Sequence, residues 1–153
     1  MPPSFHRTPC ALTIGNFDGV HQGHLALLKK LQIQAKQLQV QTCVLTFEPH
    51  PKEFFDPAKA PARILNLRDK LEALQAADID LVVVERFNAN FASMSPEVFV
   101  EKIIVDGLRA KHIVIGDDFC YGAKRAGSFA TLQQAGKISG FTVESMDTVL
   151  DQQ

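Results

Sequence analysis

The sequence predicts an α/β fold built on an open, mainly parallel sheet with helices on both faces. Short segments rich in β-branched residues alternate along the chain with segments of helical periodicity, which is the pattern of βαβ units with right-handed crossovers. Two of the short segments, 81–84 and 113–115, are apolar at every position. Such runs are typical of parallel strands that are covered on both faces. The expected strands are residues 10–15, 42–47, 80–84, 112–116 and 141–146.

Helices are expected between these strands. Residues 24–38 and the segment before residue 80 carry apolar side chains at the helical period. The tripeptide Ser95-Pro96-Glu97 is a typical helix start, with serine as N-cap, proline at the first position and an acid in the first turn. Ser128 is expected to cap a further helix. The apolar positions of the three periodic faces are Leu27, Leu28, Leu31, Ala35 and Leu38; Leu67, Leu71 and Leu74; and Phe129, Leu132 and Ala135.

Composition excludes several classes of protein. The chain has 153 residues, enough for one ordinary domain. Its net charge of -1 gives no bulk attraction to nucleic acid or to an anionic membrane. No apolar run approaches the roughly 20 residues that span a bilayer, and no secretory signal is expected at the N-terminus. An odd number of cysteines without CxxC spacing predicts reduced, buried thiols in a cytoplasmic protein; these are Cys10, Cys43 and Cys120.

Two segments interrupt the alternation. Residues 48–65 contain four prolines, and residues 117–127 contain two glycines, so neither is expected to form one regular helix. Both follow strand ends, and open parallel sheets bind their ligands outside the carboxyl ends of the strands. The functional site is therefore expected just after Gly15, Phe47 and Gly116.

The sharpest local feature is TIGNFDGVHQGH at residues 13–24, which leads from a strand end into a helix. His21 and His24 are three residues apart, so in a first helical turn both project toward the same side. The free N–H groups and partial positive charge of a helix N-terminus attract phosphate. Two imidazoles there can also donate hydrogen bonds to phosphate oxygens, and Gly23 leaves room for close approach. The segment therefore favours phosphate chemistry.

Two other interpretations of this segment stay open. The glycines can serve only to form the turn, with the histidines satisfied inside the core. The histidines can instead bind a metal, with Asp18 as a third ligand. Zinc-binding histidines on a helix are, however, more often four residues apart, as in HExxH.

Three ordered motifs carry a family resemblance. They are GNFDGVHQGH at 15–24, TFEPHP at 46–51 followed by Phe54-Phe55, and GDDFCYGAKRAG at 116–127. HQGH fits the HxGH signature of nucleotidyltransferases with a Rossmann-like fold. The three motifs together resemble the adenylyltransferase module of bacterial FAD synthetase, the bifunctional riboflavin kinase/FMN adenylyltransferase. The resemblance runs over about residues 10–147 and implies transfer of AMP from ATP to FMN, which gives FAD and pyrophosphate.

The resemblance also implies roles on the nucleotide side. His21 and His24 would hold the ATP phosphates and stabilise the transition state, with Asp18 supporting the turn. Mg²⁺ is expected to be held mainly by the ATP phosphates, and no residue is assigned as a dedicated metal ligand. Small-molecule substrates, ATP and FMN, are the expected partners, with no nucleic acid and no membrane. The residues expected to bind the nucleotide are Gly15, Asn16, Phe17 and Gly23.

The second and third motifs imply a flavin side. Aromatic side chains would form an apolar wall for the isoalloxazine ring, although any single phenylalanine can equally be a core residue. The alternative for Glu48 and His50 is a solvated loop pair, and the flavin role is favoured over it. Arg125 is better suited than Lys124 to bind the FMN phosphate, because a guanidinium binds phosphate through two hydrogen bonds. The residues expected to bind flavin are Phe47, Glu48, Pro49, His50, Phe55, Asp118, Phe119, Tyr121, Gly122 and Arg125.

The chain departs from the family pattern at its C-terminal end. The family module normally continues into a serine/threonine-rich segment ending in arginine, and then into a riboflavin kinase domain. Residues 1–153 are therefore expected to be a single adenylyltransferase domain, truncated at its C-terminus and without the kinase. Loss of a phosphate clamp is expected to lower turnover more than substrate binding. The alternatives are a non-catalytic flavin- or nucleotide-binding module and a related nucleotidyltransferase acting on another phosphate ester.

Overall fold

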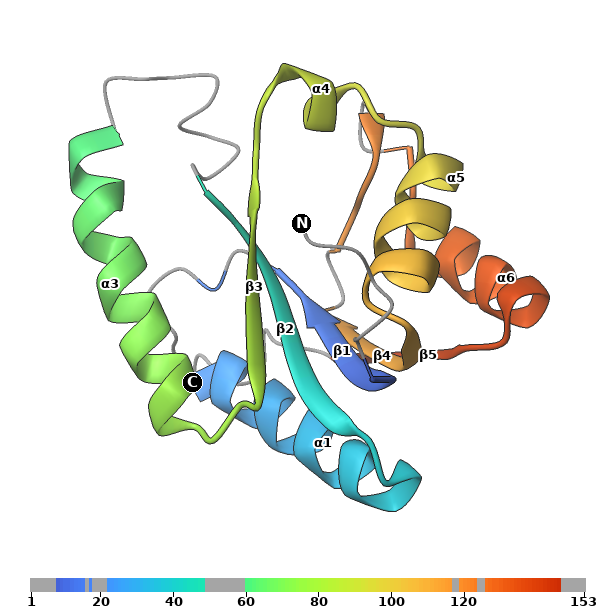
Figure 1. Ribbon diagram of the computed structural model, residues 1–153, viewed down its shortest axis with the longest axis horizontal. Coiled ribbons are helices and arrows are strands. Elements are labelled where there is room, and N and C mark those ends of the chain that lie inside the picture. Colours follow the sequence, from blue (N-terminus) through green and yellow to red (C-terminus); the bar gives the residue numbers. More distant parts are fainter. Residues whose placement is uncertain are drawn as a thin grey trace.

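The computed structural model describes residues 8–15, 17, 22–48, 60–116, 119–123 and 126–146. Five parallel strands form one sheet in the order β3-β2-β1-β4-β5 (Figure 1). This arrangement confirms the predicted α/β class and each expected strand to within two residues. The strands are β1 (Cys10–Ile14), β2 (Gln41–Glu48), β3 (Leu81–Arg86), β4 (Ala110–Gly116) and β5 (Thr142–Met146).

Helices cover both faces of the sheet. The helices α1 and α3 lie on one face, and α5, η3 and α6 lie on the other (Figure 1). In the described part of the chain, no helix has the length and apolar character needed to cross a membrane. The helices are α1 (Gln22–Leu38), α3 (Ala60–Ala76), α4 (Ala89–Ala92), α5 (Pro96–Val98), the π-helix η3 (Phe99–Gly107) and α6 (Phe129–Ser139).

The predicted helix starts are confirmed by their caps. Ser95 accepts a hydrogen bond from the backbone N–H of Val98, 3.2 Å away, with Pro96 in the first turn. Ser128 and Thr131 form a reciprocal capping box at the start of α6. These side chains satisfy N–H groups that would otherwise lack partners at a helix start.

Two apolar clusters lie on opposite faces of the sheet. Successive side chains of a strand point to opposite faces, so Leu12 packs toward η3 and α6 while its neighbour Ala11 packs toward α1 and α3. The predicted apolar face of α1 is buried from Leu27 to Ala35. Leu38, expected in the same face, is 46% exposed because it is the last residue of the helix.

Of two further expectations, the structure supports one and corrects the other. The segment 48–65 does not form one regular helix, because Glu48 belongs to β2 and α3 begins only at Ala60. Pro61 falls in the first turn of α3, where its missing N–H costs no hydrogen bond. Cys120 is exposed rather than buried, whereas Cys10 and Cys43 are buried as expected.

Candidate active site

The carboxyl ends of β1, β2 and β4 meet at one edge of the sheet, where the sequence predicts the site. β1 ends at Ile14, which is paired with Leu45 of β2. The backbone N–H of Gly15 donates to the carbonyl oxygen of Leu45 at 3.0 Å and holds the turn after β1 against β2. Gly116 ends β4 on the other side of β1. The three predicted loops therefore start from adjacent strands.

Phe17 and His24 meet beside this edge. The ring of Phe17 is 3% exposed, and its centroid lies 4.9 Å from that of the His24 ring. His24 is partly buried and is the third residue of α1. The backbone of Phe17 has a φ of 53°, a left-handed conformation that costs a residue other than glycine about 1 kcal/mol. Strain of this kind persists where the surroundings fix the backbone and is common at functional sites.

The start of α1 gives this edge the properties expected for phosphate binding. Gln22, Gly23 and His24 form the first turn, and the backbone N–H groups at a helix N-terminus point toward any anion that binds there. The helix dipole adds partial positive charge at the same point. The positions of Asn16, Asp18 and His21 lie outside the described residues, so their predicted roles, and the zinc alternative that rests on them, stay predictions.

The third motif folds back on itself in its described part. Tyr121 and Gly127 form an antiparallel bridge with two backbone hydrogen bonds, 3.1 and 2.8 Å long. Gly122 has a φ of 80°, and a Cβ there would lie 2.8 Å from the Cγ of Pro96. The N–H of Ala123 donates to the carbonyl oxygen of Met94 at 2.7 Å. A side chain at position 122 would overlap with Pro96 at the start of α5, so the fold requires glycine there. The predicted role of Gly122 in flavin binding stays a prediction.

An aromatic cluster joins three of the predicted flavin residues: Phe47, Phe119 and Tyr121. Phe119 stacks on Tyr121 at 5.7 Å between centroids and 18° between planes. Three phenylalanines outside the family motifs, which sequence analysis did not single out, complete the cluster. The centroid distances along it are Phe47–Phe91 5.3 Å, Phe87–Phe91 5.7 Å, Phe91–Phe99 5.9 Å and Phe99–Tyr121 5.3 Å.

Tyr121 is held within this cluster as a core residue. It is 6% exposed, packs on Phe99, and its hydroxyl lies 3.1 Å from Oγ1 of Thr131. Burial raises the pKa of the phenol above its ordinary value of 10.0, the hydrogen bond to Thr131 partly offsets this, and the charge of Glu97 raises it further. The fold therefore favours the neutral phenol.

The raised pKa of Tyr121 predicts a loss of stability in alkali. The unfolded chain releases the phenolic proton near pH 10.0, whereas the folded chain holds it to a higher pH. The contribution to the free energy of unfolding is therefore fully present below pH 10.0 and is lost as the pH rises through the folded pKa. Tyr121 is the single tyrosine of the chain and there is no tryptophan, so the near-ultraviolet absorbance of the phenolate measures this one group.

We expect the absorbance titration of the folded chain to have its midpoint above 10.0, and that of the urea-unfolded chain to lie near 10.0. Tyr121→Phe is the control, because it has no phenolate absorbance. Its free energy of unfolding is also expected to lack the decrease in alkali that the ionisation of Tyr121 causes. A midpoint at or below 10.0 in the folded chain would contradict the assignment.

Glu48 lies on the opposite face of the sheet from Phe47, although the two are adjacent in the second motif. Its Oε1 is 2.9 Å from Nζ of Lys70 on α3, and the same Nζ lies 3.1 Å from Oγ1 of Thr46. Lys70 was not among the residues predicted from the sequence. The signal was present, because position 70 is three residues after Leu67 and four before Leu74, on the apolar face of α3. A lysine in such a face is expected to be buried with a partner.

Several predicted flavin residues are not placed. The structure does not describe Pro49, His50, Phe55, Asp118 or Arg125, nor Lys124. Their roles stay predictions. In the described ranges, no group of three or more histidine, cysteine or acidic side chains is placed to hold a metal ion.

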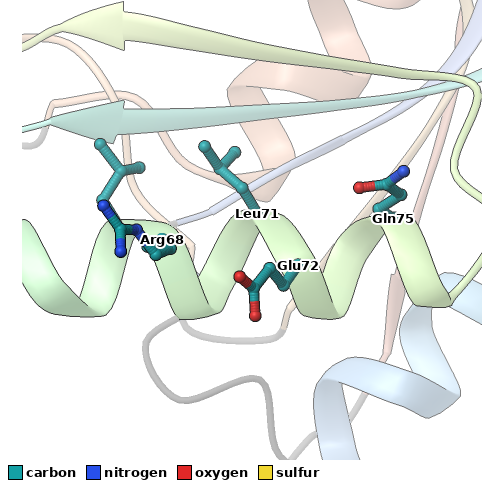
Figure 2. Close-up of a pocket in the computed structure, with 5 residues that line it drawn as sticks. Arg68, Leu71, Glu72 and Gln75 are labelled. Carbon is teal, nitrogen blue, oxygen red and sulfur yellow. The ribbon is translucent and has the colours of Figure 1, made fainter.

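A hollow of about 350 Å³ lies elsewhere, along α3 (Figure 2). In Figure 2, Leu71 extends toward the neighbouring strands, while Glu72 extends in the opposite direction. The hollow includes no predicted site residue and does not mark the site. Its lining residues are Leu67, Arg68, Leu71, Glu72 and Gln75.

Comparison with known proteins identifies the family. The family model for FAD synthetase matches residues 4–153. Three similar curated proteins are each named bifunctional riboflavin kinase/FMN adenylyltransferase. That of Haemophilus influenzae is 49% identical over 135 residues, covering 88% of this chain and 44% of its own length. Those of Pseudomonas fluorescens and Escherichia coli K12 are 48% and 45% identical, covering 92% and 91% of this chain and 45% and 44% of their own lengths.

A solved structure agrees in fold. The crystal structure titled macrolide-efflux protein from Streptococcus pneumoniae superimposes with a TM-score of 0.74 at 23% identity, covering 92% of this chain and 46% of that one. The chain spans about half the length of the curated relatives that it matches. The match of the family model over residues 4–153 and the order of the three motifs identify the same family. The chain belongs to the FAD synthetase family.

Proposed function

We propose that residues 1–153 form an FMN adenylyltransferase domain, which transfers AMP from ATP to FMN in flavin cofactor biosynthesis. The observation that carries the proposal is the position of His24. It lies in the first turn of α1 against Phe17, beside the carboxyl ends of β1 and β2. Membership of the family supports the same assignment, as do relatives up to 49% identical that are named bifunctional riboflavin kinase/FMN adenylyltransferase.

The proposed reaction is a direct displacement at phosphorus. An oxygen of the FMN phosphate attacks the α-phosphorus of ATP, a new P–O–P bond forms, and the bond from the α-phosphorus to the leaving pyrophosphate breaks. The first turn of α1 contributes backbone N–H groups, and His24 contributes a ring N–H, toward the charge that develops on the phosphate oxygens. His21 is proposed to act with it, on sequence grounds. Catalysis rests on positioning and charge stabilisation, with no covalent enzyme intermediate.

The flavin is proposed to bind over the adjacent strand ends. Phe47 and Phe119 are partly buried members of the aromatic cluster, which suits them to contact a flat apolar ring. Glu48, the last residue of β2, provides a carboxylate on the face of the sheet opposite Phe47, where Lys70 holds it. Arg125 is the proposed partner of the FMN phosphate, on sequence grounds alone.

Mg²⁺ is proposed to arrive with ATP, bound to its phosphates, where it would neutralise part of their charge. No step of the proposed mechanism passes through a protein-bound ion. The odd number of cysteines, without CxxC spacing, supports a reducing compartment, and the proposed location is the cytoplasm.

The test is to incubate the purified chain with FMN, ATP and Mg²⁺ and to follow FAD by chromatography and pyrophosphate by a coupled assay. We expect equal amounts of the two products. A reaction with α,β-methylene-ATP is the control, because its α–β bridge cannot be broken to release pyrophosphate. Binding of FMN and ATP without any FAD would favour the non-catalytic module. Turnover of another phosphate ester without FMN binding would favour the related nucleotidyltransferase.

A further inference from the structure

Lys70 is a buried charge that the proposed reaction does not use. Its side chain is 1% exposed, and it lies on the sheet-facing side of α3, one turn before the fully buried Leu74. Its ammonium group contacts the Glu48 carboxylate at 2.9 Å and the Thr46 hydroxyl at 3.1 Å. An ammonium group is costly to remove from water, and pairing it with a carboxylate often only balances that cost. An apolar side chain at position 70 would fill the same place without it, so stability alone is a weak reason for a lysine there.

The position of the pair gives a stronger reason. Thr46 and Glu48 are two residues apart on β2, so their side chains share one face, and Phe47 between them joins the aromatic cluster on the other face. The Glu48 side chain is 14% exposed, so the carboxylate lies between the interior and the open edge of the sheet. Its backbone carbonyl accepts a hydrogen bond from the N–H of Phe87 at 3.0 Å. Both the main chain and the side chain of Glu48 are therefore fixed.

We propose that Lys70 is a positioning residue, which holds the Glu48 carboxylate in one orientation toward bound FMN. This inference rests on the proposed function and deepens it. The ammonium group, which also contacts the Thr46 hydroxyl, holds Oε1 of Glu48 in place. Because a carboxylate is planar and rigid, the position of its second oxygen is then restricted as well. A glutamate without this partner would sample several rotamers and bind FMN in only a fraction of them. Lys70 acts through Glu48 and has no contact of its own with substrate.

The experiment is a double-mutant cycle on Lys70→Met and Glu48→Gln. Methionine keeps most of the buried chain of Lys70 and removes its charge, and glutamine keeps the shape of Glu48. FMN affinity is measured by quenching of flavin fluorescence, and KM for FMN and for ATP is measured by FAD formation. Lys36→Met is the matched control, since Lys36 is an exposed lysine in the last turn of α1. It is expected to leave all three quantities unchanged.

We expect Lys70→Met to raise both the Kd and the KM for FMN about tenfold, with the KM for ATP unchanged. The double variant is expected to match Glu48→Gln alone, because Lys70 acts only through that carboxylate. Thr46→Val, which removes the hydroxyl beside the ammonium group, is expected to give a smaller rise. If Lys70→Met does not fold, Thr46→Val and its combination with Glu48→Gln carry the same test.

Two results would overturn the inference alone. The first is an unchanged FMN affinity in a folded Lys70→Met variant, when the unaltered chain is active. The second is that the losses of FMN affinity caused by Lys70→Met and by Glu48→Gln add in the double variant. An unaltered chain that neither binds FMN nor forms FAD would instead overturn the proposed function, and this inference with it.

Discussion

Replacing His24 by alanine is expected to lower the rate of FAD formation about 10³-fold while leaving the fold intact. The ring of His24 lies in the first turn of α1, where it can donate to a phosphate oxygen in the transition state. Removal of one such donor from a preorganised site typically costs about 10²- to 10³-fold in kcat, or about 3–4 kcal/mol. The measurement is kcat and KM for both substrates, with the free energy of unfolding from urea denaturation as the check on folding.

The control separates chemistry from packing. His24 also packs against the ring of Phe17, with centroids 4.9 Å apart, so alanine removes that contact together with the ring nitrogens. His24→Phe keeps a ring against Phe17 and removes only the nitrogens, and we expect it to be as inactive as His24→Ala but more stable. Full turnover in either variant would remove His24 from the catalytic machinery.

The parts of the fold that could be predicted from sequence are those set by local pattern. The strands follow from short apolar runs, and the helix starts follow from caps such as Ser95 and Ser128, whose side chains bond to N–H groups three residues away. The edge that carries Gly15, Glu48 and Gly116 follows from strand direction alone, since the carboxyl ends of parallel strands meet at one edge. None of these inferences needs knowledge of how distant segments pack.

The parts that could not be predicted depend on distant contacts. Phe87 follows β3, Phe91 lies in α4 and Phe99 begins η3, and they join the aromatic cluster because the fold brings them to Phe47 and Tyr121. Nothing in their local sequence distinguishes them from other apolar residues. The π-helical hydrogen bond from Leu108 N–H to the Ile103 carbonyl oxygen has no local signal either.

The partner of a buried charge also depends on tertiary structure. The sequence places Lys70 in an apolar helical face, but only the crossing of α3 over β2 brings it to Glu48. Likewise, the sequence predicts that the adjacent motif residues Phe47 and Glu48 belong to one site. Because successive side chains of a strand point to opposite faces, the two lie on different faces of the sheet.

Gly127→Ala is expected to destabilise the chain by about 3 kcal/mol, at the upper end of the cost of overpacking a core. A Cβ at this position would lie 2.5 Å from Cζ and 2.6 Å from Cε1 and Cε2 of Tyr121. The phenol ring is confined, because it is 6% exposed, packs on Phe99 and stacks with Phe119. Its displacement would also separate the hydroxyl from Thr131, whose side chain caps α6.

Gly140 provides a control that separates the cost of steric overlap from the cost of backbone strain. Gly140 has a φ of 91°, and a Cβ added there would have nothing within 4 Å. Gly140→Ala therefore tests conformation alone and is expected to cost about 1 kcal/mol. The φ of Gly127 is not positive, so its larger cost arises from contact with the ring.

The contact with the ring can be tested by removing the ring. Tyr121→Leu removes the atoms that a new Cβ at position 127 would meet. In that background Gly127→Ala is expected to cost less than about 1 kcal/mol, because the two positions are coupled through the overlap. The measurement is the free energy of unfolding of both single variants and of the double variant in urea. Equal costs of Gly127→Ala in both backgrounds would show that the tyrosine ring is not what excludes a side chain at position 127.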